Sequence, residues 1–172
     1  MKLTNGIIYF KTPDLEDKEN VEEFKQEFEV INAKMYGKGG LSKAKSYEDW
    51  LKHLEDNNNA ENRVPASQFL VYLCEDDKMV GLVNIRHCLN NVLKERGGHI
   101  GHCVRPSLQG RGFGTMQIGL ALEFLKTLGV SQVLITCASD NIASMKTILK
   151  NGGVEDISNK SSENKKFWIK NI

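Results

Sequence analysis

A glycine-rich turn ahead of a predicted helix is the segment of this sequence best suited to binding an anion. It runs Gln-Gly-Arg-Gly-Phe-Gly-Thr from Gln109 to Thr115. The alternating glycines let the backbone approach a ligand without an intervening side chain, and Arg111 adds a positive charge. Backbone N–H groups at a helix N-terminus, together with the helix dipole, bind phosphate. The sequence therefore predicts a phosphate site, with a turn that merely needs tight geometry as the alternative.

Two nucleotide-binding motifs do not fit this turn. A P-loop carries a lysine followed by serine or threonine after its glycines, and no such pair follows Gly114. The dinucleotide fingerprint places its first glycine directly after a strand and a glycine or alanine in the sixth position. Here residues 105–109 separate the strand from Gly110, and the sixth position is Thr115. The turn is therefore not typical of a P-loop or Rossmann domain.

Two histidines on the strand before the turn are candidates for proton transfer. They are His99 and His102. The ordinary imidazole pKa of about 6.5 suits proton uptake near neutral pH. Residues three positions apart point to opposite faces of an ideal strand, so only one of the two can face a substrate. A structural, hydrogen-bonded role is the alternative for either side chain.

The four cysteines predict neither a disulfide framework nor a metal centre. They are Cys74, Cys88, Cys103 and Cys137. They show no paired spacing and lie in apolar or strand-like runs, so we expect reduced, buried thiols. Histidine and cysteine are adjacent in His87-Cys88 and His102-Cys103, but no C-x-x-C or H-x-x-x-H spacing accompanies them. No metal site is predicted.

The first half of the chain predicts two amphipathic helices and several strands. Apolar residues recur at three- and four-residue spacing after Thr12-Pro13 and again after Ser46, which is the pattern of helices with one buried face. A polar loop is expected at Asp56–Arg63. The turn Glu75–Lys78 separates two strand-like runs, as in a hairpin. Strands are predicted at residues 6–11, 68–74, 79–87 and 99–104.

The second half predicts a strand–helix–strand unit and a closing hairpin. The predicted elements are a helix at 112–128, a strand at 132–137, a helix at 141–151 and strands at 154–157 and 166–170. The first helix ends at Gly129, a typical cap. The strand at 132–137 is apolar on both faces, as expected in a parallel arrangement. The sum is a single mixed α/β domain over residues 1–172.

Composition and charge are those of an ordinary globular protein. Hydrophobic residues make up 40% and charged residues 26% of the 172 residues, and the net charge is +1. This balance argues against a dedicated nucleic-acid binder. Because no signal-peptide pattern or membrane-spanning run is present, a cytoplasmic protein is expected. Residues 14–29 carry eight acidic and two basic side chains; such a helix usually faces solvent, and attraction of a cationic ligand is the alternative.

The turn and its flanks resemble the GNAT superfamily of N-acetyltransferases. Gln109–Gly114 matches that family's Q/R-x-x-G-x-G/A signature, and Val104-Arg105-Pro106 stands where its members have a strand ending in Val-x-Pro. Asp140–Ser144, continued by Asn151-Gly152-Gly153, is similar to the second motif on the cofactor side. The resemblance is strongest from Gly97 to Gly153. Segments shared with a bacterial-type subgroup of predicted acetyltransferases are Val64–Ser67, Asn84–His87 and Gly97–Gly101.

The resemblance implies that the turn holds the pyrophosphate of acetyl-CoA, the co-substrate. Main-chain groups of Cys103 and Val104 would pair with the pantetheine arm as an added strand, and Asn141 and Ser144 would contact it from the other side. The residues implied to bind the cofactor are Cys103, Val104, Gln109, Gly110, Arg111, Gly112, Phe113, Gly114, Thr115, Asn141 and Ser144. The implied fold is a mostly antiparallel central sheet with a parallel, CoA-binding strand–helix–strand unit and flanking helices, compatible with a homodimer.

The acceptor is implied to enter from the opposite side of the split sheet, past the first two helices and the loop 37–46. It is expected to be a primary amine of a small molecule or peptide. Asn84 and Arg86 share a predicted strand face and are candidates to line its pocket. A simple ion pair between Arg86 and Glu95 is the alternative.

Direct acetyl transfer to an amine needs a base, an oxyanion donor and a proton for the leaving thiolate. A main-chain N–H near Val104 is implied as the oxyanion donor. His99 is favoured as the base because it lies next to the position of a catalytic glutamate in some relatives, and His102 is the other candidate. Many relatives protonate the sulfur with a tyrosine seven residues after the asparagine. This chain has Ile148 there, so Ser144 or water would have to substitute.

The missing tyrosine leaves three functions open. The leading one is an acetyl-CoA-dependent N-acetyltransferase. A non-catalytic acyl-CoA-binding or sensor domain is the main alternative, because it would keep the turn without turnover. An acyltransferase for longer acyl chains is the third, and the small residues Gly98 and Gly101 do not decide this point.

Overall fold

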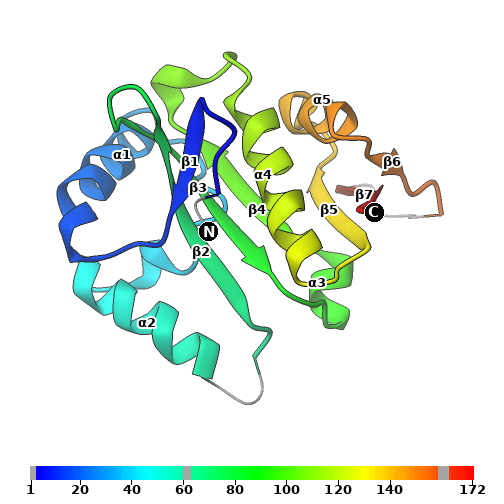
Figure 1. Cartoon of the computed structure of the whole chain (residues 1–172), viewed down its shortest axis with the longest axis horizontal. Helices are drawn as coiled ribbons and strands as arrows, with labels where there is room; N and C mark the ends of the chain where they lie inside the picture. The colour runs from blue at the N-terminus through cyan, green and yellow to red at the C-terminus, as the bar shows by residue number, and fades with distance from the viewer. Residues whose placement is uncertain (1–2, 60–62, 159–162) are drawn as a thin grey trace.

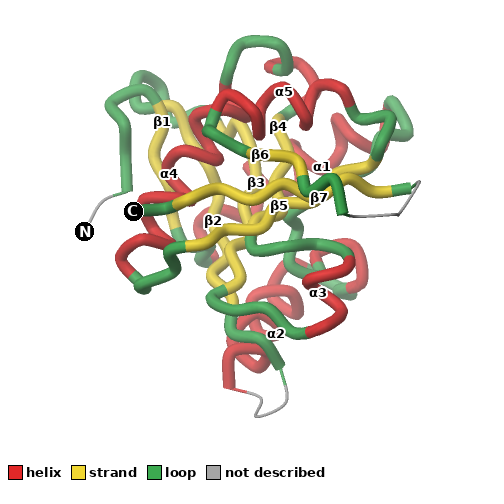
Figure 2. Tube along the Cα trace, turned by 90° about the vertical axis from the view of Figure 1, so that its right-hand side faces the viewer, coloured by secondary structure: helices red, strands yellow, loops and turns green. Residues whose placement is uncertain are grey.

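The chain forms a mixed α/β fold, as the computed structural model of residues 3–59, 63–158 and 163–172 shows (Figures 1 and 2). The strands are β1 (Ile8–Lys11), β2 (Ala66–Leu73), β3 (Met79–Arg86), β4 (Ile100–Val104), β5 (Gln132–Ala138), β6 (Val154–Glu155) and β7 (Asn164–Lys170). The α-helices are α1 (Lys18–Val30), α2 (Tyr47–Asn59), α3 (Asn91–Glu95), α4 (Phe113–Thr127) and α5 (Ile142–Lys150).

Two antiparallel sheets divide the strands. Within the described residues one sheet has the order β1-β2-β3-β4 and the other has the order β5-β7-β6. All of their ladders are antiparallel. Between β4 and β5 the described residues form only an isolated antiparallel bridge, from Gly98 to Ile135. The mixed α/β fold with a mostly antiparallel sheet and flanking helices is confirmed, and β4 and β5 of the strand–helix–strand unit share this bridge rather than a ladder.

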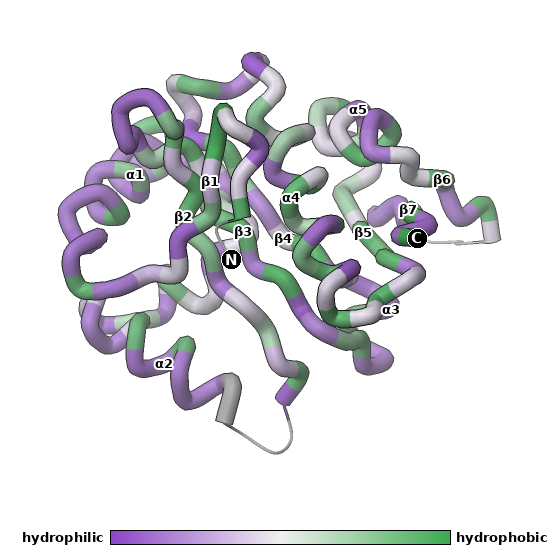
Figure 3. Tube along the Cα trace, viewed as in Figure 1, coloured by the Kyte–Doolittle hydropathy of each residue, from purple (hydrophilic) through white to green (hydrophobic). Residues whose placement is uncertain are grey.

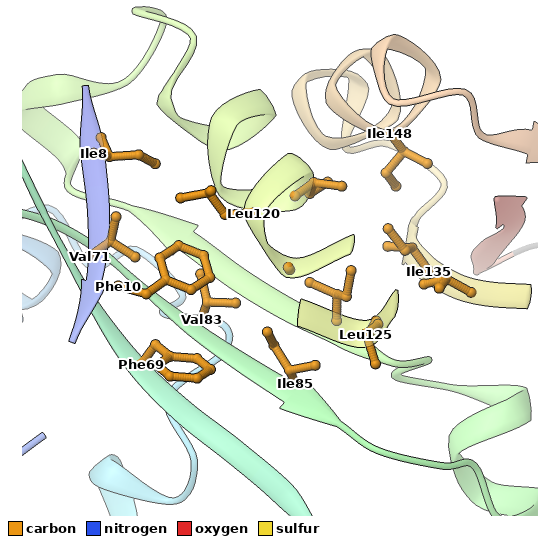
Figure 4. Packing of buried hydrophobic residues seen from close by; sticks show 14 of the residues in the cluster. Ile8, Phe10, Phe69, Val71, Val83, Ile85, Leu120, Leu125, Ile135 and Ile148 are labelled. Atoms are coloured by element: carbon orange, nitrogen blue, oxygen red, sulfur yellow. The ribbon is translucent and has the colours of Figure 1, made fainter. Parts of the chain in front are cut away.

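Helices cover both faces of the four-stranded sheet. Leu70, Tyr72 and Leu82 pack with buried side chains of α1 and α2. The alternate residues, such as Phe69 and Ile85, pack with α4, and Figure 4 shows them on the side of Leu125. Because side chains alternate between the faces of a strand, these strands are apolar on both sides. In Figure 3 both β2 and β3 show apolar (green) stretches interrupted by hydrophilic (purple) positions.

Most predicted elements are present, with three differences. The closing pair is confirmed, because β6 and β7 form an antiparallel ladder. Helix α3 was not predicted; Asn90 caps it by accepting a hydrogen bond from the Leu93 N–H (2.9 Å). Helix α2 extends to Asn59 into the predicted polar loop, of which residues 60–62 lie outside the described residues. Cys74 and Cys88 are exposed rather than buried, because they lie just past the ends of β2 and β3.

No described helix combines the length and the apolar character needed to cross a bilayer.

Gly98 allows the two sheets to approach at their junction. Its φ is 63°, in the left-handed region, and a Cβ there would lie 2.4 Å from the Leu134 carbonyl oxygen. The neighbouring His99 N–H donates to the same carbonyl (2.7 Å). Any side chain at this position would push β4 and β5 apart at the point where they are joined.

We therefore expect Gly98→Ala to destabilise the protein by about 3 kcal/mol, combining the left-handed backbone cost with a backbone clash. Gly129→Ala is the matched control, because Gly129 has a φ of 75° and open space around it. It should cost only about 1 kcal/mol. Urea unfolding followed by circular dichroism measures both losses, and equal losses would contradict the role of the clash.

Candidate active site

The glycine-rich turn keeps its backbone donors free. Gly110 and Gly112 have φ values of 78° and 87°, and a Cβ on either would meet nothing within 4 Å. In the described part of the chain, none of the N–H groups from Gly110 to Gly114 donates a hydrogen bond to another residue. The next N–H, that of Thr115, bonds to the Gly112 carbonyl (3.0 Å) as α4 begins. The turn offers consecutive donors at the positive end of the α4 dipole, an arrangement that binds phosphate.

Side chains on both flanks anchor this turn. Gln109 Nε2 donates to the Val104 carbonyl (3.2 Å) and closes the loop over the end of β4. The buried Arg105 guanidinium binds the carboxylates of Glu23 and Glu27 on α1. Two acidic side chains of the segment 14–29 therefore have a structural partner rather than a free, solvated charge. The Gln109 side chain thereby helps to position the turn.

The edge of β4 that faces β5 is unpaired beyond Gly98. β4 forms its ladder with β3, while β5 pairs with β7 along its length. An extended ligand arm can add to such an edge through main-chain hydrogen bonds. Burial raises the pKa of the Cys103 thiol to about 12, so this side chain is an inert part of the core. Its carbonyl accepts from Gln117 Nε2, and Val104 is the residue whose main chain faces the open edge.

The first turn of α5 carries Asn141 and Ser144. Asn141 Oδ1 accepts a hydrogen bond from the Ser144 N–H (3.0 Å), so Asn141 is the N-cap of this helix. The Ser144 hydroxyl lies beside the Cys137 thiol, whose pKa is raised by burial. Ile148 is fully buried in the core on the α4 side. The position of the family's tyrosine is therefore filled by a core side chain with no group that could donate a proton.

His102 has a free lone pair. Its Nδ1 lies 3.0 Å from Gln117 Oε1, and because an amide oxygen only accepts, Nδ1 carries the proton. A second hydrogen bond fixes the Gln117 side chain, in which Gln117 Nε2 donates to the Cys103 carbonyl (3.3 Å). The amide fits only because Gly81 lacks a Cβ, which would lie 1.9 Å from Gln117 Nε2. Burial lowers the pKa of His102 and the bond to Gln117 opposes this, so the neutral ring presents its Nε2 lone pair.

His99 has the opposite tautomer. Its Nδ1 accepts from the Leu134 N–H (2.9 Å), so Nε2 carries the proton in the neutral ring. Burial lowers the pKa of His99, and the nearby Arg86 charge adds to the effect. Because its one lone pair is occupied by the Leu134 N–H, His99 presents a donor in this arrangement and not a free lone pair. In the described residues, no completely buried side-chain nitrogen lacks a hydrogen-bond partner. The Nε2 atoms of His99 and His102 have no protein partner, so neither atom is completely buried, and each touches solvent.

Asn84 supports a loop rather than opening toward a ligand. Its Nδ2 donates to Gln68 Oε1 (3.2 Å), and Gln68 Nε2 donates to the Gly37 carbonyl (2.9 Å). Trp50 Nε1 donates to two further carbonyls of the same loop (3.1 Å each). The loop is thereby pressed onto β4, where a Cβ on Gly37 would lie 2.3 Å from the Gly101 oxygen. The predicted pocket residue Asn84 is buried and acts through this loop.

Arg86 lies on the same face of β3, near the start of β4. Its Nη1 donates to the carbonyls of Gly97 (3.2 Å) and Gly98 (3.1 Å). The alternative partner, Glu95, binds Lys166 instead (2.8 Å). Burial lowers the pKa of Arg86, and no carboxylate of the described residues pairs with it. Of the two predicted pocket residues, Arg86 is the one with free donors.

Sequence reasoning missed Gln117, Gly81 and Gln68. The run Met116-Gln117-Ile118 contains the signal for the first of them, because a polar residue inside an apolar helical stretch indicates a buried hydrogen-bonding role. No group of three or more metal-binding side chains gathers anywhere in the ranges that the structure describes.

The two tautomers are directly measurable. Nitrogen NMR of the histidine rings at mildly alkaline pH should show His102 protonated on Nδ1 and His99 on Nε2. Gln117→Leu removes the acceptor of the His102 Nδ1–H, so the pKa of His102 should fall further while that of His99 stays unchanged. The same tautomer on both rings would contradict the assigned geometry.

Comparisons with known proteins place this geometry in a family. The family model of the acetyltransferase (GNAT) domain matches residues 8–154. No curated protein matches the sequence. The solved structure of RimL, a ribosomal L7/L12 alpha-N-protein acetyltransferase in complex with CoA, superimposes with a TM-score of 0.69 at 14% identity, covering 99% of this chain and 98% of that one.

Two further structures share the fold at similar distance. The spermidine/spermine N-acetyltransferase SpeG from Vibrio cholerae has a TM-score of 0.61 at 16% identity, over 97% of this chain and 95% of that one. The microcin C7 self-immunity acetyltransferase MccE, in complex with acetyl-CoA and AMP, has a TM-score of 0.65 at 18% identity, over 98% and 94%. With the family model matched over most of its length, the chain belongs to the GNAT acetyltransferase family.

Proposed function

We propose that this protein is an acetyl-CoA-dependent N-acetyltransferase that transfers an acetyl group directly to a primary amine of a small molecule or peptide. The observation that carries the proposal is the row of free N–H donors from Gly110 to Gly114 at the start of α4. In a GNAT domain this row, next to an unpaired strand edge, suits the pyrophosphate and pantetheine arm of CoA. RimL and MccE were solved with CoA and acetyl-CoA, respectively.

In this proposal several segments share the binding of the cofactor. The backbone of Gln109–Thr115 donates to the pyrophosphate, and Arg111 adds a mobile positive charge. Of the two predicted residues Cys103 and Val104, Val104 offers its main chain to the pantetheine arm, because the Cys103 main chain is engaged with β3 and Gln117. Asn141–Ser144 contacts the arm from α5. Bound acetyl-CoA supplies the thioester carbonyl that the amine attacks.

The base in this proposal is His102 rather than His99. The His102 Nε2 lone pair is free and touches solvent, whereas the only lone pair of His99 is bonded to the Leu134 N–H. The His102 ring lies on the α4 side of β4, beside Gly114. The amine proton therefore reaches His102 through water at the open strand edge.

The leaving thiolate and the oxyanion have candidates of their own. A main-chain N–H of the β4 edge near Val104 stabilises the oxyanion. The Ser144 hydroxyl, or a water bound to it, returns a proton to the sulfur. One observation favours a second function, a non-catalytic CoA sensor: Ile148 is buried where relatives carry an acidic hydroxyl.

A single pair of measurements separates transferase from sensor. Acetyl-CoA and a panel of primary amines should give amine-dependent release of free CoA thiol. CoA should also raise the melting temperature, because a ligand that binds only the native state stabilises it. Stabilisation without release for any amine would identify the sensor. Absence of both would contradict both functions.

A carboxylate in the turn should weaken CoA binding. Gly112→Asp places a negative side chain beside the pyrophosphate site and should lower CoA affinity at least about tenfold. Gly129→Asp is the control, since Gly129 is also left-handed and surrounded by open space. Calorimetric titration with CoA measures both variants. Equal affinities would remove the turn from the cofactor site.

The pH dependence of turnover tests His102. Because burial lowers the pKa of His102, kcat/KM should fall on acidification with an apparent pKa below the ordinary value of about 6.5, where the base becomes protonated. His102→Gln should lose this acid limb and lower turnover roughly 100-fold. His99→Ala should keep the acid limb. If the acid limb of the pH profile is lost in His99→Ala and kept in His102→Gln, His99 and not His102 is the base.

A further inference from the structure

We propose that Arg86 and His99 bind a carboxylate of the acceptor, so that the preferred substrates are primary amines that also carry a carboxylate. This inference deepens the N-acetyltransferase function and rests on it. It is built from the surface that the two side chains form next to β4, which contains hydrogen-bond donors and a positive charge but no acidic partner.

Among the residues that the structure describes, the partly buried Arg86 has no counter-ion. A guanidinium has five N–H donors and keeps its charge. Only Nη1 has protein acceptors, the carbonyls of Gly97 and Gly98. Because every buried side-chain nitrogen of the described residues has a partner, the remaining nitrogens, Nε and Nη2, reach solvent. The hydrogen bonds to the Gly97 and Gly98 carbonyls use Nη1 alone, so they do not explain why Nε and Nη2 have no protein acceptor.

Burying a charge without a partner costs free energy, and burial lowers the pKa of Arg86 accordingly. An anion that binds here offsets that cost. The two carboxylates nearest in sequence do not supply it, because Glu95 is bound to Lys166 and Asp77 accepts from the Tyr9 hydroxyl. The missing negative charge is therefore supplied by a ligand.

His99 adds a neutral donor at the same place. The Arg86 N–H donates to the His99 carbonyl (2.8 Å), and the two residues continue the antiparallel register of β3 and β4. Opposite residues on paired strands have Cβ atoms about 5 Å apart on one face. The Leu134 N–H fixes the His99 tautomer, so Nε2 of this buried side chain, which has no acceptor among the described residues, presents a proton rather than a lone pair.

These donors lie on the side where the acceptor enters. A Cβ on Gly101 would lie 3.6 Å from Arg86 Nη1 and 3.3 Å from the Gly37 backbone. The guanidinium is therefore beside β4 and under the loop that Gln68 holds. Because residues 37 and 101 are both glycine, no side chain from either position covers the guanidinium. Two donor groups and one positive charge match the two oxygens of a carboxylate.

Matched pairs of amines test this site. Lysine and cadaverine, and phenylalanine and phenethylamine, differ only in the carboxylate. The carboxylated member of each pair should have a kcat/KM roughly 10- to 100-fold higher, as expected of a charged hydrogen bond. Peptide amides with aspartate or asparagine in second position separate an acidic side chain from a free α-carboxylate as the source. β-Alanine against phosphoethanolamine tests carboxylate against phosphate.

Variants assign the preference to residues. Arg86→Gln should abolish the preference within each pair, and Arg86→Lys, which keeps the charge but not the fork, should reduce it. His99→Ala should reduce it while keeping the acid limb of the pH profile. Arg96→Gln removes an exposed charge nearby and should change nothing. CoA-induced thermal stabilisation of each variant confirms that it is folded.

A binding measurement separates failure of this inference from failure of the proposed function. In the complex with CoA, where no acetyl group is present, phenylalanine should raise the melting temperature more than phenethylamine, and Arg86→Gln should cancel the difference. If no amine is acetylated but this difference holds, the transferase function fails and the carboxylate site stands. Acetylation without any preference, a preference that survives Arg86→Gln, or a preference for phosphoethanolamine would overturn the carboxylate site.

Discussion

Backbone pairing between the two sheets stops at Gly98, and the features of the candidate site lie around that point. Gly98 permits the close contact with Leu134, and His99 completes it through its main chain and its ring. Past this junction the edge of β4 has no partner strand among the described residues. Backbone groups on an open edge need a ligand or water. The junction therefore both joins the sheets and sets where an extended ligand can enter.

A buried amide on α4 determines which histidine can accept a proton. Gln117 is fully buried, so its amide must be hydrogen-bonded, and the Cys103 carbonyl and His102 satisfy it. This arrangement depends on the absence of a side chain at Gly81. The tautomers of His102 and His99 thus follow from main-chain and amide partners rather than from the histidines themselves. Identical residue types three positions apart acquire opposite chemistry: one ring accepts and the other donates.

The sequence predicted features whose physics is local. Glycines at 110 and 112 indicate left-handed backbone directly, and Asn141 before an apolar helical run indicates an N-cap. The roles of His99 and Arg86 were not predictable in this way. Their partners come from β5 and from the loop before β4, and the partner of the His99 ring is Leu134, far along the chain. That β5 pairs with β7 was not predictable for the same reason, because an apolar run does not reveal which strand lies beside it.

The two proposed anion sites differ in the kind of group that would make them, and this difference bears on what family resemblance can transmit. The turn at Gly110–Gly114 uses main-chain N–H groups, which survive most side-chain changes as long as the glycines remain. The acceptor side uses the side chains of Arg86 and His99 under a loop held by Gln68. Such side chains can change without disturbing the sheet that carries them. Cofactor choice therefore follows from the fold, whereas acceptor choice depends on a few side chains of each chain and has to be derived from its own geometry.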